Sequence, residues 1–368
     1  MRTFGVEEEL LLVDGVTGSP RALAPDILDR FGRGDGAGFS LEAEMQQEMI
    51  EVVSSPCTER GELLRFMRAG RRTADGLAQD RGAHAVAIAG SPMPVRPHVT
   101  TRRRYQAIAE GYAGMARTTL ECGFHVHVGI ADPEEGVAIL NRIRAWLPVL
   151  LALSANSPFR DGEDTGYASF RFVAWHHWPT AGPIDVFADA AAYRAFEQEL
   201  VATGAILDTG MLYFDARLSH SHQTVEVRIA DVCLTAEDGA ALACMVRALV
   251  DQAADDWRGG VAPLPASTAA IRLASWTAAR HGMRDRLVDP LTGTARPASA
   301  VVDRMLAWAG PALRRHGDEE AVRHALRAIA HRGTGADRQW SVYARTGSVT
   351  QVVLDAARVS RESGITRL

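Results

Sequence analysis

The stretch FGVEEELLLVD, residues 4–14, decides the fold, because three consecutive glutamates interrupt a segment that is otherwise apolar. In an extended strand the side chains alternate between the two faces of the sheet, so residues two apart share a face. Glu7 and Glu9 therefore lie on one face, and Glu8 lies on the other, where it needs an arginine, a backbone donor or water. The stretch predicts a strand that presents two carboxylates together.

Two later segments repeat this design. In GFHVHVGI (123–130) one face carries His125 and His127, and in TVEVRIADV (224–232) one face carries Glu226 and Arg228. A lone segment of this kind is typical of a half-exposed sheet. Several carboxylates and imidazoles on one face, however, repel or desolvate one another unless cations lie among them. Oxygen-rich ligation with one or two imidazoles favours magnesium or manganese over a structural zinc.

A fourth acidic segment, LEAEMQQEMIEVVSSP (41–56), is ambiguous. A helix would place Glu44, Glu48 and Glu51 on one face. The ending IEVVSSP is β-branched and stops at a proline, which favours a strand from Met49 onward. Glu51 then joins the acidic set, and Glu44 comes from the approach to that strand.

The composition excludes several classes of protein. The 368 residues are 47% hydrophobic, which allows a substantial core, and the formal net charge of -5 offers no basic surface for nucleic acid. No apolar run reaches the roughly 20 residues of a membrane span, and no signal peptide is visible, so we expect a cytoplasmic protein without membrane partners. All 40 basic residues are arginine. The absence of lysine excludes a Walker-A loop, a Schiff-base lysine, a lysine-adenylate ligase and a carbamylated-lysine metal bridge.

Helical periodicity dominates the rest of the chain, and the four scattered cysteines predict buried reduced thiols. Proline- and glycine-rich stretches predict loops at 90–98, 155–166 and 281–297. No repeat or linker divides the chain, so we expect one domain over residues 1–368. The expected helices cover residues 61–81, 133–153, 189–202, 236–257, 266–281, 298–316, 319–331 and 348–362.

Seven motifs occur in order along almost the entire chain: GVEEELLLVD, EMIEVVSSP, GFHVHVGI, ANSPF, ASFRF, VEVRIADVC and HRGTGADRQW. Together they resemble the glutamate–cysteine ligase type 2 family, in particular its YbdK-type carboxylate–amine ligases. The resemblance implies an α+β, glutamine-synthetase-like catalytic fold. In that fold a curved, mainly antiparallel sheet carries the active site on its concave face, helices pack outside, and the C-terminal third is helical.

The resemblance also implies roles for individual residues. ATP and Mg²⁺, with Mn²⁺ as the alternative ion, would bind at the polar sheet face. Arg228 and Arg171 would be the catalytic arginines and would contact substrate or ATP, together with Asn156 and Ser157 of ANSPF. The implied metal ligands are Glu7, Glu9, Glu44, Glu51, His125 and Glu226, and Arg332 and Arg338 of the last motif would reach phosphate or adenine.

The implied reaction activates a carboxylate, typically the γ-carboxylate of glutamate, as an acyl phosphate that an amine such as cysteine attacks. A homodimer is the expected assembly. One alternative is a non-catalytic amino-acid or nucleotide sensor that kept the fold. A further alternative is a metal-dependent amidohydrolase, since His-x-His is also a zinc pattern, but that class needs an early His-x-His strand and a bridging lysine.

Overall fold

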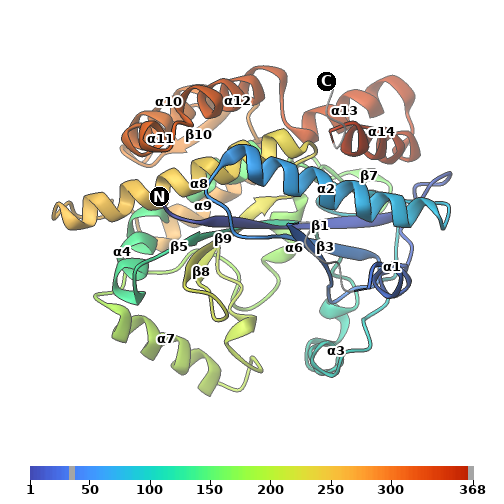
Figure 1. The fold of residues 1–368 in the computed structure, drawn as a ribbon, viewed down its shortest axis with the longest axis horizontal. Coiled ribbons are helices and arrows are strands. Elements are labelled where there is room, and N and C mark those ends of the chain that lie inside the picture. Colours follow the sequence, from blue (N-terminus) through green and yellow to red (C-terminus); the bar gives the residue numbers. More distant parts are fainter. Residues whose placement is uncertain (33–37, 364–368) are drawn as a thin grey trace.

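The computed structural model describes residues 1–32 and 38–363, and its central element is a seven-stranded antiparallel sheet (Figure 1). The long first strand, β1 (Phe4–Asp14), lies near the middle of the sheet and pairs with three other strands. Its eleven residues include apolar side chains before and after the glutamates, which suits a strand inside the sheet. The strand order is β2 (Phe39–Ala43), β3 (Met49–Ser54), β1 (Phe4–Asp14), β5 (Gly123–Gly129), β9 (Thr224–Asp231) and β8 (Ala216–Leu218), with β4 (Ala83–Val86) also paired to β1.

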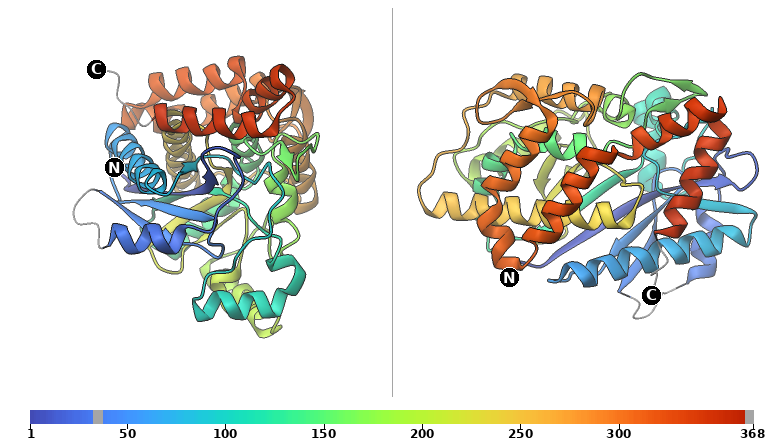
Figure 2. Two further views of the ribbon diagram at one scale, coloured as in Figure 1. Left: turned by 90° about the vertical axis from the view of Figure 1, so that its right-hand side faces the viewer. Right: turned by 90° about the horizontal axis from the view of Figure 1, so that it is seen from above.

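Two long helices, α2 (Arg60–Gln79) and α8 (Ala236–Arg258), cover one face of this sheet (Figure 1). Thr235 accepts the backbone N–H of Asp238 and caps α8, as the Thr-x-x-Asp sequence indicates. The C-terminal helices form a further layer over α2 and α8 (Figure 2). They are α10 (Ala298–Trp308), α11 (Gly310–His316), α12 (Glu319–Arg332), α13 (Gly335–Thr346) and α14 (Val349–Glu362). Helix α9 (Thr268–His281) packs instead against α5 (Leu147–Ser154).

The opposite face of the sheet carries the polar side chains, and shorter elements flank it. Helices α3 and α7 lie on this side, away from the C-terminal layer (Figure 1). The remaining elements are α1 (Ala24–Phe31), α3 (Arg103–Ala116), α4 (Pro133–Ile143), α5 (Leu147–Ser154), α6 (Phe170–Trp175), α7 (Ala190–Ala202), the 3-10 turn Thr209–Met211, and two hairpins, β6 (Phe159–Arg160) with β7 (Glu163–Asp164) and β10 (Arg286–Asp289) with β11 (Thr294–Pro297).

The α+β prediction is confirmed, with an antiparallel sheet, outer helices and a largely helical C-terminal third. The strand predicted from Met49 is also confirmed. The helix expected over 133–153 is wrong as a single element, because α4 and α5 meet at a bend of 69°. Pro148 lies in the first turn of α5, where a proline starts a helix but cannot continue one.

One further expectation needs correction, because the loop predicted over 281–297 contains the β10–β11 hairpin. The motif HRGTGADRQW spans the end of α12 and the start of α13. Thr334 and Asp337 form a capping box there. All four cysteines are buried and free, as predicted.

Over the described residues no single helix is long and apolar enough to cross a membrane. The bent pair of α4 and α5, taken together, has the length and the apolar composition of a membrane span. The residues of α5 are all buried inside the protein, so burial in the core accounts for their apolar character.

The buried face of β1 explains Glu8. Its carboxylate is fully buried and receives two hydrogen bonds from Arg71 of α2, at 3.1 Å from Nε and 2.5 Å from Nη2. Arg71 also donates to the carbonyl oxygens of Cys233 and Leu234. The pair is therefore a bidentate ion pair inside the core, in which an arginine of the same chain neutralises the glutamate.

Candidate metal and active site

The strand register brings the predicted donors together on the polar face. In an antiparallel sheet, residues directly opposite one another on neighbouring strands have side chains about 5 Å apart on the same face. Three such pairs join four strands: Glu9 of β1 with Glu51 of β3, Glu7 of β1 with His125 of β5, and His127 of β5 with Glu226 of β9.

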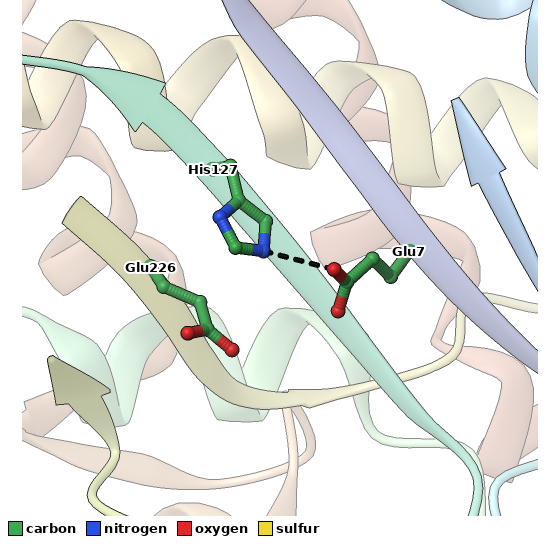
Figure 3. Close-up of side chains that lie close together, drawn as sticks. All are labelled: Glu7, His127 and Glu226. Carbon is green, nitrogen blue, oxygen red and sulfur yellow. Dashed lines mark ion pairs between the residues drawn. The ribbon is translucent and has the colours of Figure 1, made fainter. Parts of the chain in front are cut away.

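These side chains form three groups that could each hold a metal ion. Within each group the donor atoms lie within 4.8 Å of one another. Glu7 belongs to two groups and Glu51 to two, so the donors form one continuous row. Figure 3 shows one of these groups, in which Glu7 of β1, His127 of β5 and Glu226 of β9 lie close together. The groups are Glu7–His127–Glu226, Glu7–Glu51–His125 and Glu9–Glu44–Glu51.

A β-bulge between β5 and β9 changes the direction in which the neighbouring side chains point. The register between β5 and β9 shifts between Phe124 and Val126, so that Arg228 and Ile229 of β9 together oppose His125 of β5. A bulge of this kind re-aims side chains and is frequent beside active sites. Arg228 keeps its guanidinium on the polar face against Glu226, whereas Ile229 is buried in the core.

Two histidines hold Glu7 at the centre of the row. His125 Nδ1 lies 2.8 Å from Glu7 Oε2, and His127 Nε2 lies 3.1 Å from Glu7 Oε1. Burial opposes ionisation of Glu7, but the hydrogen bonds to His125 and His127 outweigh it and hold the carboxyl pKa below its usual value. Burial and the nearby Arg228 lower the pKa of His125, which favours the neutral imidazole that a metal ion needs.

The other end of the row is crowded with carboxylates. Burial, followed by the charge of Glu9, raises the pKa of Glu44 to about 8. Burial and the charge of Glu44 raise the pKa of Glu51 well above its usual value. Because the described residues provide no cation between these groups, the arrangement fits a divalent ion with oxygen ligands.

Two arginines surround Glu226. Arg217 of β8 donates to Glu226 at 2.7 Å, and Arg228 pairs with its other oxygen. Burial alone would raise the pKa of Glu226, but the charges of Arg228 and Arg217 lower it below its usual value. This end of the row therefore combines an ionised ligand with two guanidinium groups that can receive an anion.

The row of donors lines a cavity of about 310 Å³, called here the metal cavity. Its walls include side chains that sequence reasoning missed or ranked low. All four residues of the segment SHSH (219–222), which precedes β9, line the cavity. The wall residues outside the predicted set include Arg104, Tyr105, Glu121, His127, Trp175, Trp178, Tyr213, Arg217 and Ser219 to His222.

A second cavity of about 680 Å³ lies beside the first and is called here the arginine cavity. Arg96, Arg117, Arg160 and Arg171 line it, together with Ser157 and two acidic residues, Glu121 and Asp161. Glu121 lines both cavities.

Gly123 shows how close Arg171 lies to the metal donors. A Cβ atom on Gly123 would collide with Arg171 Nη2 and would lie 3.1 Å from His125 Nε2. Arg171 Nε is buried without a hydrogen-bond partner in the described protein, although Nη1 and Nη2 donate to the carbonyl oxygens of Ile229 and Arg228. The guanidinium therefore retains donor capacity at the junction of the two cavities.

Three predicted site residues lie elsewhere. Asn156 is fully buried, donates to the carbonyl oxygens of Ala87 and Val232, and accepts from Gln339, which ties α13 to the core. Arg332 pairs with Asp238, and Arg338 pairs with Asp355, both with substantial exposure to solvent. The structure does not bring these three residues to either cavity.

Comparison with known proteins places this geometry in a family. The profile of the glutamate–cysteine ligase family 2 (GCS2) matches residues 3–355. The chain is 47% identical to a Paenarthrobacter aurescens protein named "Putative glutamate--cysteine ligase 2-1", over 99% of this chain and 96% of that protein. It is 44% identical to "Putative glutamate--cysteine ligase 2" of Streptomyces coelicolor, over 97% of this chain and 99% of that protein.

Solved structures share the fold at low identity. Glutamate–cysteine ligase from Francisella tularensis in complex with AMP superposes with a TM-score of 0.66 at 12% identity, over 100% of this chain and 89% of that chain. A bifunctional glutathione synthetase from Pasteurella multocida gives a TM-score of 0.70 at 14% identity, and this chain spans about half of its length, 53%. The resemblance seen in the motifs is confirmed: the chain belongs to the glutamate–cysteine ligase family 2.

Proposed function

We propose that this chain is an ATP-dependent carboxylate–amine ligase of the glutamate–cysteine ligase type. The observation that carries the proposal is the row of carboxylates and imidazoles on one sheet face, which forms three overlapping donor groups in a member of this family. The reaction would join the γ-carboxylate of glutamate to an amine, with cysteine as the first candidate, and would release ADP and phosphate.

Mg²⁺ is the proposed ion, held by Glu7, Glu9, Glu44, Glu51 and Glu226 with imidazole from His125 or His127. When bound, it would neutralise the charge of the ATP phosphates and of the transferred phosphoryl group. This role matches the donor chemistry, because oxygen ligands suit a hard cation. Burial first, and neighbouring carboxylates second, raise the pKa values of Glu44 and Glu51, and a bound cation would offset both effects.

The protein's own contribution to phosphoryl transfer is positioning and positive charge. Arg228 and Arg217 flank Glu226 at one end of the row, where they can hold phosphate oxygens. Arg171 lies beside His125 at the junction of the cavities, where it can hold a carboxylate or the acyl phosphate formed from it. Ser157, whose hydroxyl donates to Asp231 and accepts from the Arg171 N–H, keeps that segment in place.

The test is ADP release by the purified full chain with Mg-ATP and glutamate, measured with and without each member of a panel of amines that includes cysteine. We expect ADP release that depends on both glutamate and an amine. If no acid and amine combination gives amine-dependent ADP, the ligase proposal fails and the non-catalytic sensor becomes the better description.

A further inference from the structure

Glu121 is a buried carboxylate at the meeting point of the two cavities. It lies between α3 and β5 and is 6% exposed, yet it lines both the metal cavity and the arginine cavity. Arg160 Nη1 donates to Glu121 Oε1 at 2.9 Å, and a backbone bridge to Gly90 fixes the main chain. The side chain is therefore held in one place by the protein.

Glu121 differs from the other carboxylates of the metal cavity. All the others belong to the three donor groups, whereas Glu121 belongs to none of them. Its second oxygen, Oε2, has no hydrogen-bond donor in the part of the chain that the structure describes. Oε2 faces Gly90, where an added Cβ atom would lie only 3.1 Å away, so the glycine keeps this oxygen uncovered.

A ligase that uses an amine needs such a group. Amines are mostly protonated at neutral pH, with an unperturbed pKa of about 10.4 for a lysine-like amine. An ammonium nitrogen has no lone pair to attack an acyl phosphate, so it must first lose a proton to a base. The base has to contact the amine without being committed to a metal ion.

We propose that the arginine cavity admits the amine substrate and that Glu121 is the catalytic residue that accepts the proton of its ammonium group. This inference rests on the proposed ligase function. The ammonium N–H bond breaks, and its proton bonds to Glu121 Oε2. The freed nitrogen lone pair forms the C–N bond at the acyl carbon, and the C–O bond to phosphate breaks, so that inorganic phosphate leaves with that electron pair. The second proton of the nitrogen is lost to solvent.

The surroundings of Glu121 suit this role. Burial raises its pKa to about 8, against the opposing charges of Arg160 and Arg171, and a base works best when its pKa lies near the working pH. Four arginines and two acidic residues line the arginine cavity, which favours an amine that carries its own carboxylate. Cysteine is therefore the first probe. ATP and the metal ions would then bind in the metal cavity, which contains the metal-donor side chains and has aromatic walls.

Hydroxylamine separates the proton transfer from acyl phosphate formation, because it is largely unprotonated at neutral pH and attacks acyl phosphates without a base. The experiment compares wild type with Glu121→Gln, which keeps the size of the side chain and can still accept a hydrogen bond from Arg160. Each protein receives Mg-ATP and glutamate with either cysteine or hydroxylamine, and peptide or hydroxamate is quantified. Glu163→Gln, the same change at an exposed position on the neighbouring hairpin, is the matched control.

We expect Glu121→Gln to lower kcat with cysteine by about 10² to 10⁴-fold and to form hydroxamate within a few-fold of wild type. Glu163→Gln should match wild type with both nucleophiles. Equal retention of both reactions in Glu121→Gln overturns the inference, and so does equal loss of both in a protein with unchanged thermal unfolding. If Glu121→Gln fails to fold, Glu121→Ala replaces it, because alanine also removes the proton acceptor; the same selective loss with cysteine is expected, and the same outcomes contradict the inference.

Wild type itself separates the two proposals. If it forms no hydroxamate and no peptide, the ligase function fails and this inference fails with it. If it forms hydroxamate but accepts neither cysteine nor any other protonated amine of the panel, the ligase chemistry stands and the role of Glu121 is overturned.

Discussion

Glu7 and Glu8 are adjacent in the chain and have opposite environments. Glu8 lies on the helix-covered face, where Arg71 neutralises it with two hydrogen bonds. Glu7 lies on the open face among other carboxylates and two histidines, in two of the three donor groups. The difference teaches that strand alternation assigns one glutamate to stability and its neighbour to function. The two differ in their partners: Arg71 pairs with Glu8, whereas the described part of the chain pairs Glu7 with histidines and with no arginine.

The largest effect on stability is expected from Glu8→Ala. The substitution leaves the Arg71 guanidinium buried without a counter-charge, so the free energy of unfolding should fall by about 3 to 5 kcal/mol. Denaturant titration measures it. The double variant Glu8→Leu with Arg71→Met is the control, because it removes both charges and should recover much of the loss. A Glu8→Ala protein as stable as wild type would show that the pair contributes nothing.

A comparable effect, on activity instead of stability, is expected from Glu7→Gln. The change removes a charge shared by two donor groups and should lower kcat by about 10² to 10³-fold, or about 3 to 4 kcal/mol, by analogy with the loss of one charge-stabilising contact. ADP release under saturating Mg-ATP measures it. Glu8→Gln is the matched control and should keep the wild-type rate per folded molecule. Equal rates in Glu7→Gln and wild type would contradict the site.

A smaller effect is expected from pH on the stabilisation of the fold by Mg²⁺. Glu44 has a pKa raised from 4.5 to about 8, so the folded, metal-free protein binds more protons than the unfolded chain in that interval. Its contribution to stability is therefore present below about pH 4.5 and is lost as the pH rises toward 8. Mg²⁺ needs the ionised carboxylates, so the Mg²⁺-induced rise in Tm should be larger at pH 8 than at pH 5. Thermal unfolding with Mg²⁺ or with chelator tests this, and a rise that shrinks with pH would contradict it.

The smallest effects are expected at Arg332 and Arg338. Both make exposed ion pairs outside the two cavities, so alanine at either position should change stability by at most about 1 kcal/mol and leave the rate of ADP release within about two-fold. Steady-state kinetics over a range of ATP concentrations checks this. A large rise in KM for ATP would restore the role that the last motif implied for them.

Strand periodicity was enough to predict which face Glu7, Glu8 and Glu9 occupy, because alternation is a local property of a strand. It could not predict which residues of different strands stand opposite one another. The register places His127 against Glu226 and so adds a donor that was not assigned as a ligand. Arg217 lies on a three-residue strand that has no periodicity of its own, and only the fold brings it to Glu226.

Asn156 and Glu121 also show that local sequence patterns do not determine which residues meet in the site. Asn156 lies in the ANSPF motif, but its side-chain amide is used in joining the core to α13, where its partner Gln339 is 183 residues away in sequence. Glu121 had no motif around it, and its importance follows from the two cavities that meet there. Short-range patterns thus predicted the strands, whereas the long-range packing that makes the site had to come from the structure.

The most direct test of the donor row is Mn²⁺ binding, measured by electron paramagnetic resonance for wild type, Glu7→Gln and Glu8→Gln without nucleotide. We expect wild type and Glu8→Gln to bind Mn²⁺ with the same affinity and Glu7→Gln to bind it much more weakly, because only Glu7 belongs to the donor groups. No Mn²⁺ binding by wild type, or equal binding by Glu7→Gln and Glu8→Gln, would contradict the assignment of this sheet face as a metal site.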